Sequence, residues 1–388
     1  MSLCENQRVV GLVQSEIRAM TLACTQAQGI NLAQGVCDTG VPPVVVEAAK
    51  QAMDQGLNTY TRCDGLAELR QALAQRMETF NHLKVNPETE MTVSAGATGA
   101  FHCVCMALLN PGDEVIIFEP YYGYHVTTLV SVEAVPKVVP LKRPDWSLSL
   151  EELEELEQAM TSRTKAIVVN TPGNPSGKVF TREELEGIAA VARRHDLFVF
   201  TDEIYEYFVY DDRTHVSIGS LPDMADRTVT ISGYSKTFSI TGWRIGHAVA
   251  ASRWSSIIGA MNDLVYVCAP APLQYGVAVG IKELRHAFYK DMCVAFQAKR
   301  DRFCEVLERV GLTPTIPQGA YYVLADVSRL PGDTGKAKAL WILDKTGVAG
   351  VPGEAFFQAD RGQQFIRFSF AKTDADLNEA CERLRKLI

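Results

Sequence analysis

Leu197-Phe198-Val199-Phe200-Thr201-Asp202 is the stretch that decides the fold. An unbroken apolar run that ends in an acid is typical of a strand with both faces buried in a parallel sheet, where side chains at the carboxyl end meet ligands. The run 166–170 has the same character and ends in Asn170. The Pro- and Gly-rich turn that follows it exposes Asn174. We therefore expect two neighbouring central strands that bring Asp202 and Asn174 to one edge of a sheet.

The rest of the chain alternates helical and apolar extended patterns, without repeats or a low-complexity linker. Alternation of this kind predicts an α/β fold, with a mostly parallel sheet covered by helices on both faces. We expect a large domain at 44–283 and a smaller α+β domain at 284–388, which the N-terminal helix and arm (1–43) join. The helices expected before residue 283 are 8–28, 44–55, 65–80, 99–109, 150–160 and 181–194. The strands expected there are 114–118, 134–139, 165–170, 197–202, 228–232 and 245–250. In the smaller domain we expect helices at 284–310, 336–345 and 374–387 and strands at 320–326 and 364–370.

Lys236 lies in the second informative stretch, which runs from Ile231 to Thr237 and follows an apolar run typical of a buried strand. A lysine amine that is partly withdrawn from water can lose its proton and condense with an aldehyde. Arg244 follows eight positions later (244 − 236 = 8) and offers a planar pair of donors suited to a phosphate. An aldehyde and a phosphate on one small molecule describe pyridoxal phosphate, whose ring nitrogen usually meets a carboxylate, here Asp202.

Four motifs resemble those of the aminotransferase family of fold-type I pyridoxal-phosphate enzymes, in the family's order and spacing. They are Asn-Thr-Pro-Gly-Asn-Pro-Ser-Gly (170–177), Thr-Asp-Glu-Ile-Tyr (201–205), Ser-Lys-Thr-Phe (235–238) and Gly-Trp-Arg-Ile-Gly (242–246). The likeness covers almost the whole chain, from the segment 31–35 to the segment 366–369. It implies an aspartate-aminotransferase-like fold with a sheet of the seven-stranded type. It also implies a ping-pong transamination from an L-amino acid to a 2-oxo acid such as 2-oxoglutarate.

The same resemblance assigns catalytic and cofactor-binding roles. It implies that Lys236 holds the cofactor and moves the substrate α proton, and that Asp202 keeps the pyridine nitrogen protonated. Tyr205 and Asn174 would bond the ring's phenolic oxygen, and Arg244 would bind the phosphate. The further cofactor contacts that it implies are the turn Gly96, Ala97 and Thr98 before a helix starting near Gly99, the stacking ring of Tyr122 and the hydroxyl of Ser235. Ser232 is the alternative to Ser235, because the family's usual serine position holds Gly233.

Substrate binding and assembly are implied in the same way. Arg367 resembles the clamp for the substrate α-carboxylate, with Asn174 and the backbone of Gly35 beside it. Tyr60 resembles the tyrosine that reaches the phosphate of the neighbouring subunit, which implies a homodimer with shared sites. Segment 268–274 resembles the branch that acts on methionine, glutamine, aromatic amino acids and kynurenine. Tyr122, Tyr124 and Val36 favour a bulky apolar or aromatic donor, although packing between domains is an equally good interpretation of them.

Other interpretations remain open at this point. Taken one at a time, these residues are ordinary surface charges, helix caps, turns and packing aromatics. A pyridoxal-phosphate carbon–sulfur β-lyase on the same fold would share nearly every cofactor contact. A nucleotide-binding protein is disfavoured, because the stretch before Lys236 lacks the glycines of a phosphate loop. A non-enzymatic effector-binding domain would need an attached DNA-binding module, for which the chain has no room.

Bulk composition fits a globular enzyme. The chain has 388 residues, of which 47% are hydrophobic and 22% charged, and a formal net charge of −8 argues against nucleic-acid or acidic-membrane partners. The start has no apolar signal core, so we expect a cytoplasmic protein. The ten cysteines form no metal-binding spacing, and we predict no metal. Cys37 and Cys63 fall in loops that the resemblance places near the site, without an assigned role.

Overall fold

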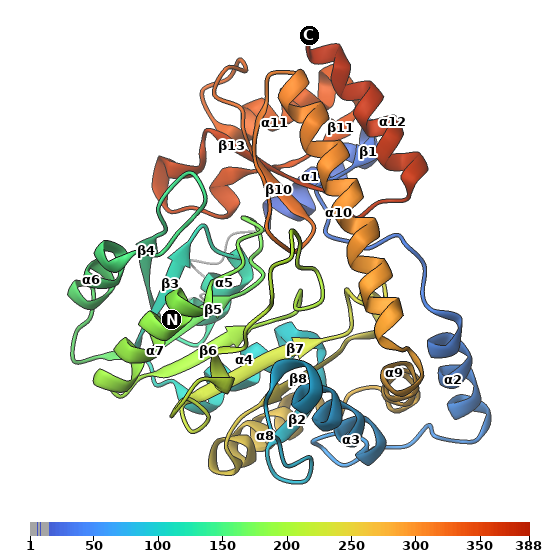
Figure 1. Ribbon diagram of the computed structural model, residues 1–388, viewed down its shortest axis with the longest axis vertical. Helices are drawn as coiled ribbons and strands as arrows, with labels where there is room; N and C mark the ends of the chain where they lie inside the picture. Colours follow the sequence, from blue (N-terminus) through green and yellow to red (C-terminus); the bar gives the residue numbers. More distant parts are fainter. Residues whose placement is uncertain (1–5, 7, 9–14) are drawn as a thin grey trace, which may run out of the picture.

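The computed structural model describes residues 6, 8 and 15–388. A seven-stranded sheet forms the lower half of the molecule in Figure 1, with the strand order β2-β8-β7-β6-β5-β3-β4. Neighbouring strands are parallel except that β8 is antiparallel to both β2 and β7. The strands are β2 Met91–Ala95, β3 Glu114–Glu119, β4 Val135–Pro140, β5 Thr164–Asn170, β6 Phe198–Asp202, β7 Thr228–Gly233 and β8 Ile245–Val249.

The register of this sheet explains why residues far apart in sequence meet. Asn170 at the end of β5 lies opposite Asp202 at the end of β6. Strand β7 ends there too, three residues before Lys236. Because β8 runs in the opposite direction, its first residues lie at this same edge, and Arg244 directly precedes them. The single antiparallel strand therefore brings an arginine to the edge where the parallel strands deliver a lysine and an acid.

Helices cover both faces of the large sheet. Apolar side chains alternate along β3 and β5, so that Ile116 and Ile167 face α6 and α7 whereas Ile117 and Val168 face α4, α5 and α8. Helices α2, α3 and α9 pack against β2 and β8 at the other end. The helices are α1 Glu16–Gln26, α2 Pro43–Asp54, α3 Ala67–Arg76, α4 Gly96–Leu108, α5 Gly123–Ser131, α6 Leu150–Gln158, α7 Arg182–Arg194, α8 Ser252–Tyr266, α9 Ala271–Glu283, α10 His286–Arg309, α11 Gly335–Thr346 and α12 Asp374–Leu384.

A second, four-stranded antiparallel sheet with the order β12-β13-β10-β9 lies in the upper half of Figure 1, against α10, α11 and α12. In the N-terminal arm, the two-residue strand β1 pairs with β11 in parallel. These strands are β1 Ile30–Asn31, β9 Thr313–Thr315, β10 Tyr322–Asp326, β11 Val348–Ala349, β12 Val351–Pro352 and β13 Phe365–Ser369. The domain boundaries at 43/44 and 283/284 stay a prediction.

The predicted fold class, an α/β fold with a mostly parallel seven-stranded sheet and a smaller sheet with helices, is confirmed. Strand β2, helices α5, α8 and α9, and the short strands β1, β9, β11 and β12 are additional to the predicted elements. The helix expected near Gly99 begins at Gly96, and the one expected to reach residue 80 turns into a π-helix at Met77–Asn81. The described part of the predicted helix 8–28 is helical from Glu16 to Gln26, and its residues 9–14 lie outside the described part.

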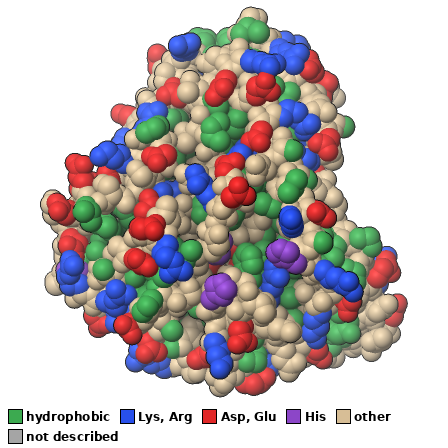
Figure 2. All heavy atoms as spheres, viewed as in Figure 1, with side chains coloured by type: hydrophobic (Ala, Val, Ile, Leu, Met, Phe, Trp, Pro, Cys, Tyr) green, Lys and Arg blue, Asp and Glu red, His purple; other side chains and the backbone are tan. Residues whose placement is uncertain are grey.

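The surface carries both signs of charge. On the face shown in Figure 2, acidic and basic side chains are intermingled rather than gathered into a patch of one sign. No helix among residues 15–388 combines the length and the apolar character that crossing a membrane requires.

Candidate active site

A cavity of about 370 Å³ opens at the carboxyl edge of the large sheet, between that sheet and the smaller one. Its lining comes from strands β5, β6, β10 and β13, from the segments after β5, β6 and β7 and before β8, from the arm residues 34–36, and from the starts of α1, α4 and α5. The predicted site residues that line it are Gly35, Ala97, Thr98, Tyr122, Asn174, Asp202, Tyr205, Ser235, Lys236, Arg244 and Arg367. The structure thus brings nearly every predicted site residue to one cavity.

Lys236 is half-buried on the wall of this cavity. Its Nζ donates to the backbone oxygen of Gly35 at 3.2 Å. A Cβ atom on Gly35 would come within 1.8 Å of the Tyr322 hydroxyl oxygen, so a side chain at this position would displace that hydroxyl. The segment 34–36 therefore carries the lysine's hydrogen-bond acceptor into the cavity on a backbone without a side chain.

Asp202 ends β6 with a carboxylate held from one side by His125. The His125 Nε2 atom lies 2.9 Å from Asp202 Oδ2, and His125 is buried between the rings of Phe101 and Tyr122. Because a carboxylate only accepts, Nε2 is the donating nitrogen of this pair. The arrangement orients a buried carboxylate toward the cavity, where it can meet a protonated ring nitrogen.

Arg367 is the most deeply buried cation of the site. Its guanidinium donates to Asn174 Oδ1 at 2.8 Å and to the carbonyl of Ala33, and it lies 4.3 Å from the Tyr322 ring centroid and 4.9 Å from that of Phe356. Burial lowers the pKa of Arg367 from its usual value. Its Nε–H has no partner in the described structure. A buried guanidinium with an unsatisfied donor beside a cavity suits a substrate carboxylate.

The opposite end of the cavity is a cradle of backbone N–H groups and one arginine. Helix α4 begins at Gly96, whose φ is +76°, and a Cβ atom there would lie 2.2 Å from Arg244 Nη2. Gly246 leaves room for the backbone of the same turn, since its Cβ would lie 2.2 Å from the Ala97 nitrogen. A helix N-terminus, an arginine and two glycines that permit close approach are the parts of a phosphate site.

The two alternative serines are separated by the structure. Ser235 lines the cavity, and its buried Oγ has no hydrogen-bond partner among the described residues. Ser232 does not line the cavity, and its Oγ donates to Glu206 Oε1 at 2.9 Å. Of the two serines, only Ser235 therefore has an unpartnered hydroxyl at the cavity.

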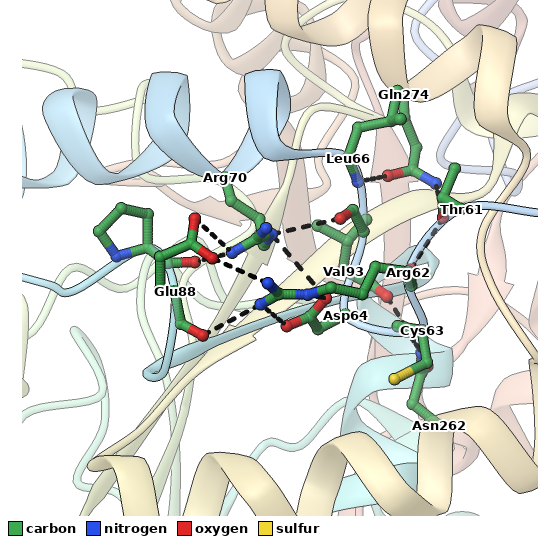
Figure 3. Close-up of polar contacts among 12 residues, drawn as sticks. Thr61, Arg62, Cys63, Asp64, Leu66, Arg70, Glu88, Val93, Asn262 and Gln274 are labelled. Atoms are coloured by element: carbon green, nitrogen blue, oxygen red, sulfur yellow. Dashed lines mark hydrogen bonds and ion pairs between the residues drawn. The ribbon is translucent and has the colours of Figure 1, made fainter. Parts of the chain in front are cut away.

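Two predicted residues do not line this cavity: Gly96, which lies directly before Ala97 of the lining, and Tyr60, which is 82% exposed. The loop 60–65 that carries it is held in place by the polar network of Figure 3. Arg62 donates to Asp64 Oδ1 at 2.6 Å and to Glu88 Oε2 at 2.8 Å. The loop thus presents an exposed aromatic side chain from a fixed backbone. Cys37 and Cys63 do not line the cavity either.

Three site residues were not predicted from the sequence: His125, Tyr322 and Asn170. Asn170 accepts from the Asn174 backbone nitrogen at 2.8 Å and donates to the Asp202 carbonyl at 3.0 Å, so it ties the two strand ends together. Its place at the end of an apolar run was a usable signal. His125 lies one helical turn after Tyr122, but α5 itself was not predicted. Tyr322 has no local signal, because only the pairing of β10 with β13 sets it beside Arg367.

The residues fit pyridoxal phosphate. A carboxylate, a lysine amine and a phosphate cradle lie around one cavity, which matches the ring nitrogen, aldehyde and phosphate of that molecule. The unpartnered Ser235 hydroxyl and the space kept free by Gly96 are what a bound phosphate would fill. No other cofactor is indicated by this set of groups.

A fold and a site of this kind define a pyridoxal-phosphate enzyme of the aspartate-aminotransferase type. The family model "Aminotransferase class I and II" matches residues 27–384, and the chain belongs to this family. It is therefore an aminotransferase that uses pyridoxal 5′-phosphate to move an amino group from an amino acid to a 2-oxo acid. This result argues against the nucleotide-binding and effector-binding interpretations.

Individual relatives are similar over nearly full length. Kynurenine–oxoglutarate transaminase 3 of Rattus norvegicus is 35% identical, covering 98% of this chain and 89% of the relative. The aspartate aminotransferase of Pyrococcus abyssi is 36% identical, covering 96% and 95%. The structure of N-succinyldiaminopimelate aminotransferase from Mycobacterium tuberculosis superposes with a TM-score of 0.95 at 32% identity, covering 99% of this chain and all (100%) of that one. The relatives' names differ in the amino acid, so they leave the donor open.

Proposed function

We propose that the enzyme transfers the amino group of a bulky apolar or aromatic L-amino acid to 2-oxoglutarate. The observation that carries the proposal is the buried Arg367 beside a cavity that also holds Lys236 and Asp202. Bound at this site, pyridoxal phosphate supplies an electron sink for the charge left when the substrate loses its α proton. Transamination also follows from the family, whereas the donor class and the residue roles below are inferred.

The position of each residue in the cavity indicates its role in the reaction. Arg367 and Asn174 bind the substrate α-carboxylate, which presents the α carbon to the Lys236 amine. Lys236 takes the α proton onto its Nζ atom and would return it to the carbon of the cofactor's former aldehyde. Asp202, oriented by His125, would hold the proton on the ring nitrogen. Because a carboxylate bound at Arg367 covers this side of the cavity, it also displaces water from the reacting atoms.

The geometry described above supports the remaining cofactor contacts. Tyr205 would donate to the ring's phenolic oxygen, since burial raises its pKa well above the usual value and keeps its proton in place. Tyr122 faces the cavity from the N-terminus of α5 and would stack on the ring. The residues that would hold the phosphate are Gly96, Ala97 and Thr98 in the first turn of α4, together with Arg244 and Ser235.

The donor preference rests on the walls of the cavity. Ile17, Val36 and Tyr124 line it, and a second cavity of about 620 Å³ shares Ile17 and Tyr124 with the first. Among the described residues the only lysines and arginines that line the first cavity are Lys236, Arg244 and Arg367, and each has another role. An acidic donor such as aspartate would need a further cation. A large apolar side chain would instead contact Ile17, Val36 and Tyr124 in the first cavity.

A single-turnover spectral screen tests the donor. The loaded enzyme is mixed with kynurenine, phenylalanine, methionine and aspartate in turn, and the loss of the cofactor's visible band is followed. We expect the three bulky donors to react at least ~10-fold faster than aspartate, which corresponds to about 1.4 kcal/mol of barrier. Faster reaction with aspartate would contradict the proposed donor class. Release of pyruvate without an oxo-acid acceptor would instead indicate the β-lyase.

We further propose a homodimer in which Tyr60 of one subunit reaches the phosphate of the other. The support is an exposed tyrosine on a loop whose backbone is fixed by Arg62 and its partners. Sedimentation should give a dimer, and Tyr60→Ala should weaken cofactor binding while the dimer persists. A monomer with a full affinity for the cofactor would contradict the shared site.

We also propose a cytoplasmic location. The nine cysteines in the described part of the chain are free thiols. Reduced thiols are typical of the cytoplasm, where disulfides rarely persist. Cell fractionation with a tagged protein measures this directly, and recovery from an oxidising compartment would contradict it.

A further inference from the structure

Tyr322 lies at the centre of the site although no local sequence signal marks it. Its hydroxyl oxygen is 2.9 Å from that of Tyr205, and the same oxygen fills the space where Gly35 would carry a Cβ atom. The carbonyl oxygen of Gly35 in turn accepts a hydrogen bond from the Lys236 amine. The Tyr322 hydroxyl is therefore packed between Tyr205 and the backbone that holds the lysine.

The ring of Tyr322 is fixed as firmly as its hydroxyl. The Arg367 guanidinium lies over its face at 4.3 Å, and the rings of Tyr205 and Tyr321 meet it at 5.7 Å and 4.9 Å. The residue is 2% exposed. A buried ring packed against a guanidinium and two other rings cannot turn its hydroxyl toward another partner without repacking the site.

The direction of the hydrogen bond between the two tyrosines determines whether Tyr205 presents a proton or only lone pairs to the cavity. Each hydroxyl has one proton, so within the pair one hydroxyl donates and the other accepts. If Tyr205 donated to Tyr322, it would face the cavity with lone pairs only. If Tyr322 donates, Tyr205 keeps its own proton for a ligand. The cation over the Tyr322 ring favours the second arrangement, because donation leaves extra negative charge on the Tyr322 oxygen.

We propose that Tyr322 is a positioning residue that donates its hydroxyl proton to Tyr205, so that Tyr205 aims its own proton at the cofactor's phenolic oxygen. This inference rests on the proposed roles of Tyr205 and Lys236. No covalent step is assigned to Tyr322. It acts only through Tyr205, and a hydroxyl that accepts one hydrogen bond becomes a stronger donor of the next.

The arrangement has a spectroscopic consequence. A hydrogen-bond donor at the phenolic oxygen stabilises the negative charge there. Without that donor, the charge would attract a proton more strongly to the nitrogen that Lys236 contributes. Loss of the Tyr322 hydroxyl should therefore make that proton harder to remove. The pH midpoint of the cofactor's visible band should rise, in the same direction as after loss of the Tyr205 hydroxyl.

The test is a pH titration of the visible band of the holoenzyme, from about pH 5 to about pH 10. Tyr322→Phe should raise the midpoint by roughly half a unit to one unit, as expected for one hydrogen bond worth about 1 kcal/mol. Tyr205→Phe should raise it further. The double variant should match Tyr205→Phe alone, because Tyr322 has no route to the cofactor except through Tyr205.

Tyr210→Phe is the matched control. Tyr210 is 1% exposed, and its hydroxyl donates to the backbone oxygen of Ala320 outside the cavity. Its removal should cost similar stability and leave the midpoint unchanged. A midpoint that also stays unchanged in Tyr322→Phe, or shifts that add in the double variant, would overturn the inference.

A second variant covers the case in which Tyr322→Phe does not load the cofactor. Gly35→Ala places a Cβ atom within 1.8 Å of the Tyr322 oxygen and pushes the hydroxyl away from Tyr205. It should shift the midpoint upward as well, and an unchanged midpoint counts against the inference. A wild-type protein with no pH-sensitive visible band would contradict the proposed role of Lys236 instead, and the two failures are therefore distinguishable.

Discussion

At the scale of single residues, a buried charge needs a partner that keeps it oriented. Asp202 shows this most clearly. The strand predicted from its apolar run delivers the carboxylate to the cavity, but His125, which lies on helix α5, determines how the carboxylate points. The orientation of the Asp202 carboxylate therefore depends on both β6 and α5.

We predict that His125→Leu lowers kcat by about 10-fold to 100-fold, because a hydrogen bond to a charged group is worth about 1.5–3 kcal/mol. Steady-state kinetics at saturating cofactor measure this change. His102→Leu serves as the control, since His102 lies on α4 without lining the cavity. Equal activities of the two variants would contradict a role of His125 in holding Asp202.

At the scale of elements, the first turn of α4 forms the phosphate cradle only because its glycine allows a positive φ and the approach of Arg244. Gly96 and Gly56 make a matched pair for testing this. Both have positive φ, at +76° and +85°, but a Cβ at Gly96 meets Arg244 whereas one at Gly56 meets nothing within 4 Å.

We predict that Gly96→Ala and Gly56→Ala lose similar stability, about 1 kcal/mol, from the left-handed conformation alone. Only Gly96→Ala should weaken cofactor binding, by 10-fold or more, because it displaces the arginine. Thermal unfolding of the apoenzyme and a cofactor titration separate the two effects. If both variants bind the cofactor as wild type does, the cradle is not where we place it.

The elements that sequence reasoning missed have physical explanations. In β2 the residues Thr92 and Ser94 are polar yet buried, so the strand lacks an apolar run of the kind that marked β6. Helix α5 is rich in β-branched residues, which favour strands in isolation. Central strands such as β6 were predictable because burial on both faces leaves a continuous apolar signal.

The same difference in local sequence signal separates the site residues that were predicted from those that were missed. Lys236, Asp202 and Asn174 follow apolar runs or Pro- and Gly-rich turns, so local pattern alone marks them. His125 lies on a helix that was not predicted. Tyr322 depends on the pairing of two strands more than forty residues apart in sequence (322 and 367), which no local pattern reports.

At the scale of the whole molecule, a buried polar cluster behind the sheet ties β6 to the loop that follows it. His215 Nε2 lies 3.0 Å from Glu203 Oε2, and Asn81 donates to Glu206 at 2.7 Å. Burial opposes the charge on His215, but the attraction of Glu203 outweighs it and raises the pKa of the histidine. Burial also raises the pKa of Glu206.

Both shifts predict the same dependence of stability on pH. A group whose pKa is raised in the folded protein stabilises it below the unfolded pKa, and this contribution is lost as pH rises through the folded pKa. For His215 the contribution is complete below about pH 6.5 and declines above it. The melting temperature of wild type should therefore fall toward that of His215→Gln as pH increases from about 6.5. Parallel melting curves over this range would contradict the coupling.

The central claim of this account is that Lys236 carries the cofactor in a cavity shared with Asp202 and Arg244. Reduction of the holoenzyme with borohydride, followed by peptide mass spectrometry, tests it most directly, because reduction fixes the cofactor permanently to its amine. We expect the added mass on the peptide that contains Lys236, and none on that peptide from Lys236→Ala. Attachment to a different lysine, or no attachment in wild type, would contradict the account.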